Sequence, residues 1–156
     1  MAKFPQIYSE NLNKEEVLVP DQLQGNPKLL IVAFKRWHQG LVNGWIPFLE
    51  SLMVKHPTFD YYELPTIRSM NFIYRRFIDG GMRAGIPSRS TRSRTITLYI
   101  DKDSFKGALD IVTEETIHLF LVDLSGETIW RGEGGLNDEK AGALDREIEE
   151  YLKPSE

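Results

Sequence analysis

The pattern of apolar and polar positions is most informative between residues 29 and 52. Five consecutive apolar residues, Leu29 to Ala33, predict a strand that is buried on both faces. A polar turn follows, and apolar residues then recur with the spacing of one helix face. Pro47 lies inside this helix and should kink it, because proline has no N–H and its ring crowds the carbonyl four residues earlier. The apolar positions of the predicted helix are Leu41, Trp45, Leu49 and Leu52.

Further strands are predicted where β-branched and aromatic residues dominate. One covers residues 58–64 and ends at Leu64-Pro65, and another covers residues 95–100. Residues 117–123 and 127–132 flank Leu-Ser-Gly, which predicts a hairpin. Residues 1–28 are polar without a clear period, and short extended pieces are expected there at 3–8 and 17–19.

Helical spacing predicts a second helix over residues 67–82 and a short one within residues 101–111, capped by Asp103 or Ser104. The last helix begins after Asn137 or Asp138. Its predicted inner face consists of Ala141, Leu144, Ile148 and Leu152. Strands and helices that alternate in this way favour an α/β fold. We expect one domain at residues 29–153, preceded by an N-terminal extension at residues 1–28.

The amino-acid composition excludes several classes of chemistry but says less about the fold. The chain contains no cysteine, which excludes disulfides, cysteine-ligated zinc, iron–sulfur clusters and every cysteine nucleophile. No apolar run approaches the roughly 18–20 residues that a membrane-spanning helix needs. The first residues include acidic side chains and lack an apolar signal core. We therefore expect a cytoplasmic protein, with peripheral contact to the inner membrane as an option.

The strand and helix of residues 29–52 resemble the first strand and the active-site helix of the thioredoxin-like superfamily. The likeness is greatest to its membrane-anchored thiol reductases and its peroxiredoxins. A comparison without gaps places Gln39 and Val42 where the reductases have their two cysteines. Neither side chain can perform thiol chemistry. The resulting vestigial active-site turn consists of Trp37, His38, Gln39 and Val42.

This resemblance implies a three-layer α/β/α fold around a mixed five-stranded sheet. A lead-in, Pro20 to Gly25, is similar to the segment that precedes the first core strand in those proteins. Right-handed crossovers would make the first three core strands parallel, and the sheet order would be third, second, first, fourth, fifth. The reductases also need a cis-proline just before the hairpin, facing a low-pKa thiolate. Residues Thr113 to Thr116 occupy this approach without a proline, so the resemblance does not imply redox catalysis.

Three segments narrow the resemblance: residues 39–48, residues 62–65 with the helix after them, and residues 120–144. The last contains Phe-Leu-Val-Asp, a turn glycine, Ile-Trp-Arg-Gly and an acidic helix start. Over residues 17–152 the chain thereby resembles the mitochondrial ATP synthase F0 assembly factors, which are divergent thioredoxin-like proteins. This implies an assembly or chaperone-like role. It also marks Trp130 and Arg131 as a family-signature surface, for which simple packing on the sheet is the alternative.

Arginines are concentrated in one window of the chain. Residues 68–94 contain seven of the ten arginines and one acidic residue, so they carry +6 in a chain whose net charge is −4. Arginine binds phosphate and carboxylate groups through paired hydrogen bonds. The window predicts a surface for an anionic partner; the alternative is a solvated helix face and loop that pair with the acidic remainder of the chain. The proposed surface consists of Arg75, Arg76, Arg83, Arg89, Arg92 and Arg94.

Metal and cofactor signals are weak. His38, His56 and His118 show no paired-ligand spacing, so we predict no metal site. The glycines after the hairpin do not form a nucleotide-binding fingerprint, and we predict no cofactor. His38 has a side chain suited to proton transfer near neutral pH, but the turn contains no catalytic partner for it. The turn therefore favours a structural or peptide-contact role, and proton transfer by His38 is the alternative.

Together these patterns predict a non-redox protein that is not an enzyme and that acts by binding another protein. Its role would be that of an assembly factor or chaperone for a membrane complex such as ATP synthase. The alternative is an antioxidant, peroxiredoxin-like or other small-molecule enzyme with a non-cysteine site near His38. Nucleic-acid binding by the Ser/Arg loop at residues 88–94 is disfavoured by the net charge of −4. The oligomeric state is not predicted.

Overall fold

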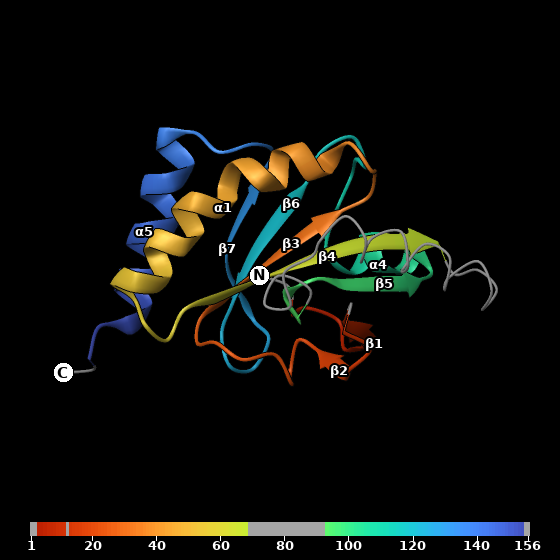
Figure 1. Ribbon diagram of the computed structural model, residues 1–156, viewed down its shortest axis with the longest axis horizontal. Helices are drawn as coiled ribbons and strands as arrows, with labels where there is room; N and C mark the ends of the chain where they lie inside the picture. Colours follow the sequence, from red (N-terminus) through yellow and green to blue (C-terminus); the bar gives the residue numbers. More distant parts are fainter. Residues whose placement is uncertain (1–2, 12, 69–92, 155–156) are drawn as a thin grey trace.

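The protein is represented by a computed structural model, which describes residues 3–11, 13–68 and 93–154. Its strands form one mixed sheet in the order β2-β1-β5-β4-β3-β6-β7 (Figure 1). The strands are β1 (Ile7–Asn11), β2 (Glu16–Val19), β3 (Lys28–Ala33), β4 (Asp60–Arg68), β5 (Ile96–Ile100), β6 (His118–Val122) and β7 (Thr128–Glu133). The helices in the described ranges are α1 (His38–Lys55), α4 (Lys102–Ala108) and α5 (Asp138–Leu152).

Strand β3 is the interior strand predicted from the apolar run. It pairs in parallel with β4 and antiparallel with β6, so both of its backbone edges are hydrogen-bonded. Leu29 and Ile31 face one side of the sheet, whereas Leu30 and Val32 face the other, and all four are fully buried. This confirms the prediction of a strand that is apolar on both faces.

Helices cover both faces of the sheet, so the described chain has three layers (Figure 1). Trp45 and Leu49 of α1 pack with Leu144 and Ile148 of α5 over one face. Phe105 of α4 belongs to the core on the opposite face. No helix in the described ranges is long and apolar enough to cross a membrane.

The sheet has seven strands, so the predicted count of five was wrong and the order of the whole sheet differs from the prediction. Within it, the five core strands keep the predicted order of third, second, first, fourth, fifth, as β5-β4-β3-β6-β7. The additional strands, β1 and β2, come from the N-terminal segment and form an antiparallel hairpin that joins the sheet at β5. Strand β2 contains the extended piece expected at 17–19, whereas β1 overlaps the piece expected at 3–8 only at Ile7 and Tyr8. Residues of β1 alternate between half-buried and exposed positions, and its polar half gave no signal. The predicted boundary between residues 28 and 29 remains a prediction.

The second core strand continues beyond its predicted end. Proline at position 65 was expected to terminate the strand, but β4 runs on to Arg68. Pairing with β3 ends at Pro65, while pairing with β5 continues from Thr66. The missing N–H of proline is tolerated because it falls where the hydrogen-bonded partner changes. Residue 67 therefore belongs to β4 and not to a helix; the rest of the predicted 67–82 helix lies outside the described residues, except for position 68 in β4.

The helix starts were predicted to within a few residues. The side chain of Asp101, not that of Asp103 or Ser104, caps α4 by accepting hydrogen bonds from the N–H groups of those two residues. Asn137 caps α5. Leu144 and Ile148 form the buried face of α5, whereas Leu152 at its end is 36% exposed.

Candidate functional site

The predicted vestigial turn lies where β3 passes into α1, and its side chains point in different directions. Trp37 is the N-cap residue of α1 and is 55% exposed. His38 begins the helix and is fully buried, with its ring 4.5 Å from the ring of Trp37 in an edge-on contact. Gln39 is exposed and donates a hydrogen bond to Asn43, while Val42 is buried in the core.

His38 holds the turn together from inside. Its Nδ1 accepts hydrogen bonds from the backbone N–H groups of Phe34, at 3.0 Å, and Lys35, at 3.2 Å. An imidazole nitrogen that accepts two hydrogen bonds carries no proton, so the ring is neutral with its proton on Nε2. Burial lowers the pKa of His38 below its ordinary value of 6.5, although the nearby backbone of Glu115 opposes this shift.

The other ring nitrogen of His38, Nε2, is buried and makes no hydrogen bond of ordinary geometry within the described residues. The nearby backbone of Glu115 favours the protonated ring without satisfying this N–H. The arrangement suits a structural role better than proton transfer to a substrate, because a general base needs a free nitrogen within reach of the proton that it takes.

The loop that precedes β6 closes over this turn. The backbone carbonyl of Thr113 accepts a hydrogen bond from Nε2 of the buried His118 at 2.8 Å. Lys35 and Glu115 form an ion pair at 2.6 Å between the turn and the loop. The ring of Phe34 lies 6.1 Å from that of His118. Residues 113–116, which lack the cis-proline, are therefore held in place by the hydrogen bond from His118 and by the ion pair between Glu115 and Lys35.

Apolar side chains lie near the start of α1 among exposed polar residues. Trp37 and Leu41 are one helical turn apart, and Leu41 is half-buried. The loop after β7 reaches the same part of the helix, because Nε1 of Trp45 donates to the carbonyl of Gly134 at 3.0 Å. Leu136 in this loop is 37% exposed. These side chains place apolar area beside the turn and leave the tryptophan accessible.

One side chain of the predicted arginine surface, that of Arg94, lies within the described residues. Arg94 lies against β4, where it pairs with Asp60 at 3.1 Å and stacks over Tyr61 at 5.1 Å. These two contacts hold Arg94 against β4, and whether it also binds an anionic partner stays a prediction. The other members, Arg75, Arg76, Arg83, Arg89 and Arg92, lie outside the described residues.

The family-signature residues on β7 point to opposite faces of the sheet. Trp130 is partly buried against the core beneath α1 and α5. Arg131 crosses to the other face, where its guanidinium donates to the carbonyls of Leu109 and Asp110 after α4. It also stacks over the ring of Phe120 at 4.9 Å. Both side chains have packing roles, and whether they also form a partner surface stays a prediction.

Sequence reasoning missed two polar groups. Glu63 of β4 is buried and shares a hydrogen bond with Thr95; burial raises the pKa of its carboxyl. His56, Asp145 and Glu149 come together at the far end of α1. The only sequence signal for this cluster was the spacing of Asp145 and Glu149, which places both carboxylates on one face of a helix. His56 is 89 residues from Asp145 in sequence, so nothing local connected them.

Comparison with solved structures identifies the fold. The thiol:disulfide interchange protein from Bacteroides sp. is 18% identical, with a TM-score of 0.63 over 95% of this chain and 89% of that one. The thioredoxin domain of a thiol-disulfide oxidoreductase from Bacteroides vulgatus is 18% identical, with a TM-score of 0.60 over 94% and 96%. A thioredoxin family protein from Chlorobium tepidum TLS, a thiol:disulfide interchange protein, is 11% identical, with a TM-score of 0.58 over 97% of both chains.

The chain therefore has a thioredoxin-like α/β fold with a mixed sheet. No model of a known protein family matches it, and no curated protein does so either. The narrower resemblance to ATP synthase assembly factors is not supported by these comparisons. At these identities the likeness shows the fold alone, and the absence of cysteine separates this chain from the thiol chemistry in the names of its neighbours.

Proposed function

We propose that this protein is a non-redox, non-enzymatic thioredoxin-like domain that binds another protein through the surface around Trp37. The observation that carries the proposal is the 55% exposure of this large aromatic side chain beside a turn whose own histidine is buried. Tryptophan is among the residues that contribute most to binding when an interface buries them. The cysteine positions hold Gln39 and Val42, so the turn offers contact area without a thiol.

The partner that we propose is a subunit of a membrane complex such as ATP synthase, for which the protein acts as an assembly factor or chaperone. The support for this narrower statement is the sequence resemblance over residues 17–152. Its most specific segment, residues 120–144, forms β6, β7 and the start of α5. The arginine window is a second candidate contact, suited to acidic segments or headgroups at the membrane surface.

Mild cross-linking followed by affinity capture from membrane and soluble fractions tests the proposal. The wild type should recover membrane-complex subunits, and Trp37→Ala should weaken the affinity for them by about thirtyfold and reduce recovery accordingly, because a tryptophan at the centre of an interface contributes about 2 kcal/mol or more. Tyr8→Ala is the matched control, since Tyr8 is an aromatic residue on β1 that is 81% exposed. Equal recovery by wild type and Trp37→Ala, or no specific partner, would contradict the proposed surface.

A second candidate function is supported by the unsatisfied Nε2 of His38, which could bind a small polar molecule. In that case the protein is an enzyme with a non-cysteine site, in the class of antioxidant or other small-molecule enzymes. Peroxidase and hydrolase assays on wild type and His38→Asn distinguish the two candidates. Turnover by the wild type that disappears in His38→Asn would replace the binding proposal with the enzymatic one.

A further inference from the structure

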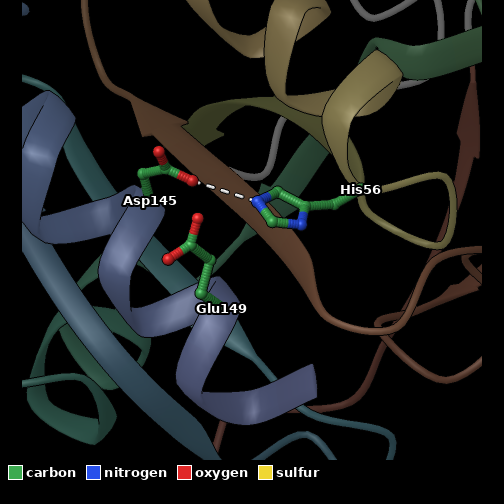
Figure 2. A group of neighbouring side chains, drawn as sticks. All are labelled: His56, Asp145 and Glu149. Atoms are coloured by element: carbon green, nitrogen blue, oxygen red, sulfur yellow. Dashed lines mark hydrogen bonds and ion pairs between the residues drawn. The ribbon is translucent and has the colours of Figure 1, made fainter. Parts of the chain in front are cut away.

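A histidine and two carboxylates converge where the end of α1 meets α5, away from the turn at Trp37. Nε2 of His56 lies 3.0 Å from Oδ1 of Asp145. The ligand atoms of His56, Asp145 and Glu149 all lie within 4.8 Å of one another. Figure 2 shows the His56 ring directed from α1 toward the carboxylates on α5. One nitrogen and two oxygen donors therefore face a common point.

The histidine of this cluster is held in place by its backbone. The N–H of His56 bonds to the carbonyl of Leu52 at 2.7 Å, and its own carbonyl accepts from the N–H of Phe59 at 2.9 Å. The residue is 9% exposed, so its ring has little freedom to rotate away. Asp145 and Glu149 are one turn apart on a regular helix, next to the core residues Leu144 and Ile148. The donors are thus preorganised on two rigid elements, as a metal site requires.

A cation already lies between the two carboxylates. Nζ of Lys55 is 2.7 Å from Asp145 and 2.7 Å from Glu149. Its side chain is 50% exposed, so the ammonium can move into solvent without opening the core. The two contacts show that both carboxylates already face one positive charge.

We propose that His56, Asp145 and Glu149 bind a divalent transition metal ion of the Zn²⁺ class, which displaces the ammonium of Lys55. One imidazole nitrogen and two carboxylate oxygens are ligands that Zn²⁺ accepts, at bond lengths of about 2.0–2.2 Å. Three protein ligands leave a position for water. Mg²⁺ and Ca²⁺ are excluded from the proposal because they prefer sites made of oxygen ligands. The ion would cross-link the two helices that cover one face of the sheet.

Competition with Lys55 gives the proposal its sharpest test. Isothermal titration of the chain with ZnCl₂ should show one binding site in the wild type. Lys55→Met should bind Zn²⁺ about fivefold more tightly, because the internal competitor for both carboxylates is gone. His56→Ala and Glu149→Gln should each weaken binding by at least about tenfold, as expected when a ligand to the metal is lost.

The matched control is Glu150→Gln. Glu150 is the next carboxylate on α5 and pairs with Lys153 instead of the cluster. This variant should bind Zn²⁺ like the wild type, and anomalous scattering from a Zn²⁺-soaked crystal should place the ion between His56 and Glu149. If His56→Ala does not fold, Glu149→Gln decides, because its side chain is 47% exposed. Absence of Zn²⁺ binding in both wild type and Lys55→Met, or binding that Glu149→Gln leaves unchanged, would overturn the proposal.

Discussion

The imidazole of His38 satisfies two backbone N–H groups that the turn between β3 and α1 would otherwise leave without an acceptor. A buried donor that loses its acceptor costs about 1–3 kcal/mol, which is more than the net value of the hydrogen bond itself. The histidine therefore stabilises the turn that presents Trp37. From its residue type and its position, His38 resembles a catalytic residue. In the fold it stabilises the turn by accepting two backbone hydrogen bonds.

Replacing this acceptor should destabilise the protein in a graded way. His38→Ala should lower the free energy of unfolding by about 2–3 kcal/mol, because both N–H groups lose their partner. In His38→Asn the side-chain oxygen can take the place of Nδ1, so at least half of that loss should be recovered. Urea unfolding followed by circular dichroism measures both values. Equal losses in the two variants would show that the acceptor does not matter.

Stability should also depend on pH through His38. Its pKa in the folded protein is lowered, so between that value and 6.5 the unfolded chain binds a proton that the folded chain does not. Stability is therefore greatest above about pH 6.5 and falls as the pH drops below it. His38→Asn should show a shallower decline between about pH 7.5 and 5.5. The difference between the two unfolding curves removes the contributions of Lys35, Glu115 and His118, which face the ring. Parallel curves would contradict the prediction.

At the scale of the elements, contacts between side chains far apart in sequence determine the position of helices that the hydrophobic period alone does not place. The end of α4 is fastened to β7 by Arg131, whose guanidinium reaches two consecutive carbonyls. Lys102 and Lys106 of α4 both pair with Glu114, and these hydrogen bonds lower the pKa of that carboxyl to about 2. Helix α4 has only seven residues, and a helix of this length is marginally stable on its own. These contacts therefore contribute more to its stability than the intrinsic helix propensity of its residues.

Arg131→Lys should destabilise the protein although the charge is kept. An ammonium cannot reproduce the planar fork that spans Leu109 and Asp110, or the stacking over Phe120. The expected loss in free energy of unfolding is about 1 kcal/mol. Arg146→Lys on the exposed side of α5 is the control and should change stability by less than about 0.5 kcal/mol. A loss of equal size in the control would indicate a general effect of the substitution.

Sequence patterns predicted elements whose buried positions form a continuous apolar run or recur with a regular period, and they failed elsewhere. The apolar run of β3 and the spacing of Trp45 and Leu49 located the strand and the helix, because both elements bury those positions. The continuation of β4 past Pro65 was missed, since a change of strand partner has no local signal. The turn at His38 was located for the same reason as β3, but the inward direction of its ring depends on tertiary packing. The pairing of His56 with Asp145 required the fold itself.

At the scale of the whole molecule, the N-terminal segment contributes to the common core. Phe4 is 2% exposed and makes edge-on contacts with Phe105 and Phe120, each at 5.8 Å between ring centroids. Its backbone N–H bonds to the carbonyl of Gly126 in the β6–β7 turn. Val19 at the end of β2 is fully buried in the same cluster. These contacts join the first residues of the chain to the centre of the fold.

Phe4→Ala tests whether residues 1–28 are an extension or a part of the domain. If they fold with the rest, the substitution should cost about 3–5 kcal/mol, as for other buried phenylalanines, and unfolding should remain a single transition. Thermal and urea denaturation measure both features. Tyr8→Ala, at an exposed position on β1, should change stability by less than about 0.5 kcal/mol. A loss below about 1 kcal/mol in Phe4→Ala would support the predicted boundary at residues 28 and 29.

Strand β2, at the end of the sheet order, has a further consequence for how copies of the protein behave in concentrated solution. An edge strand presents unpaired backbone groups to which another chain can add by the same hydrogen-bond pattern. This strand has four residues, follows Lys14 and Glu15, begins with Glu16, and ends immediately before Pro20. Shortness, charge and proline all oppose strand addition. The edge is therefore protected against edge-to-edge aggregation by its own sequence.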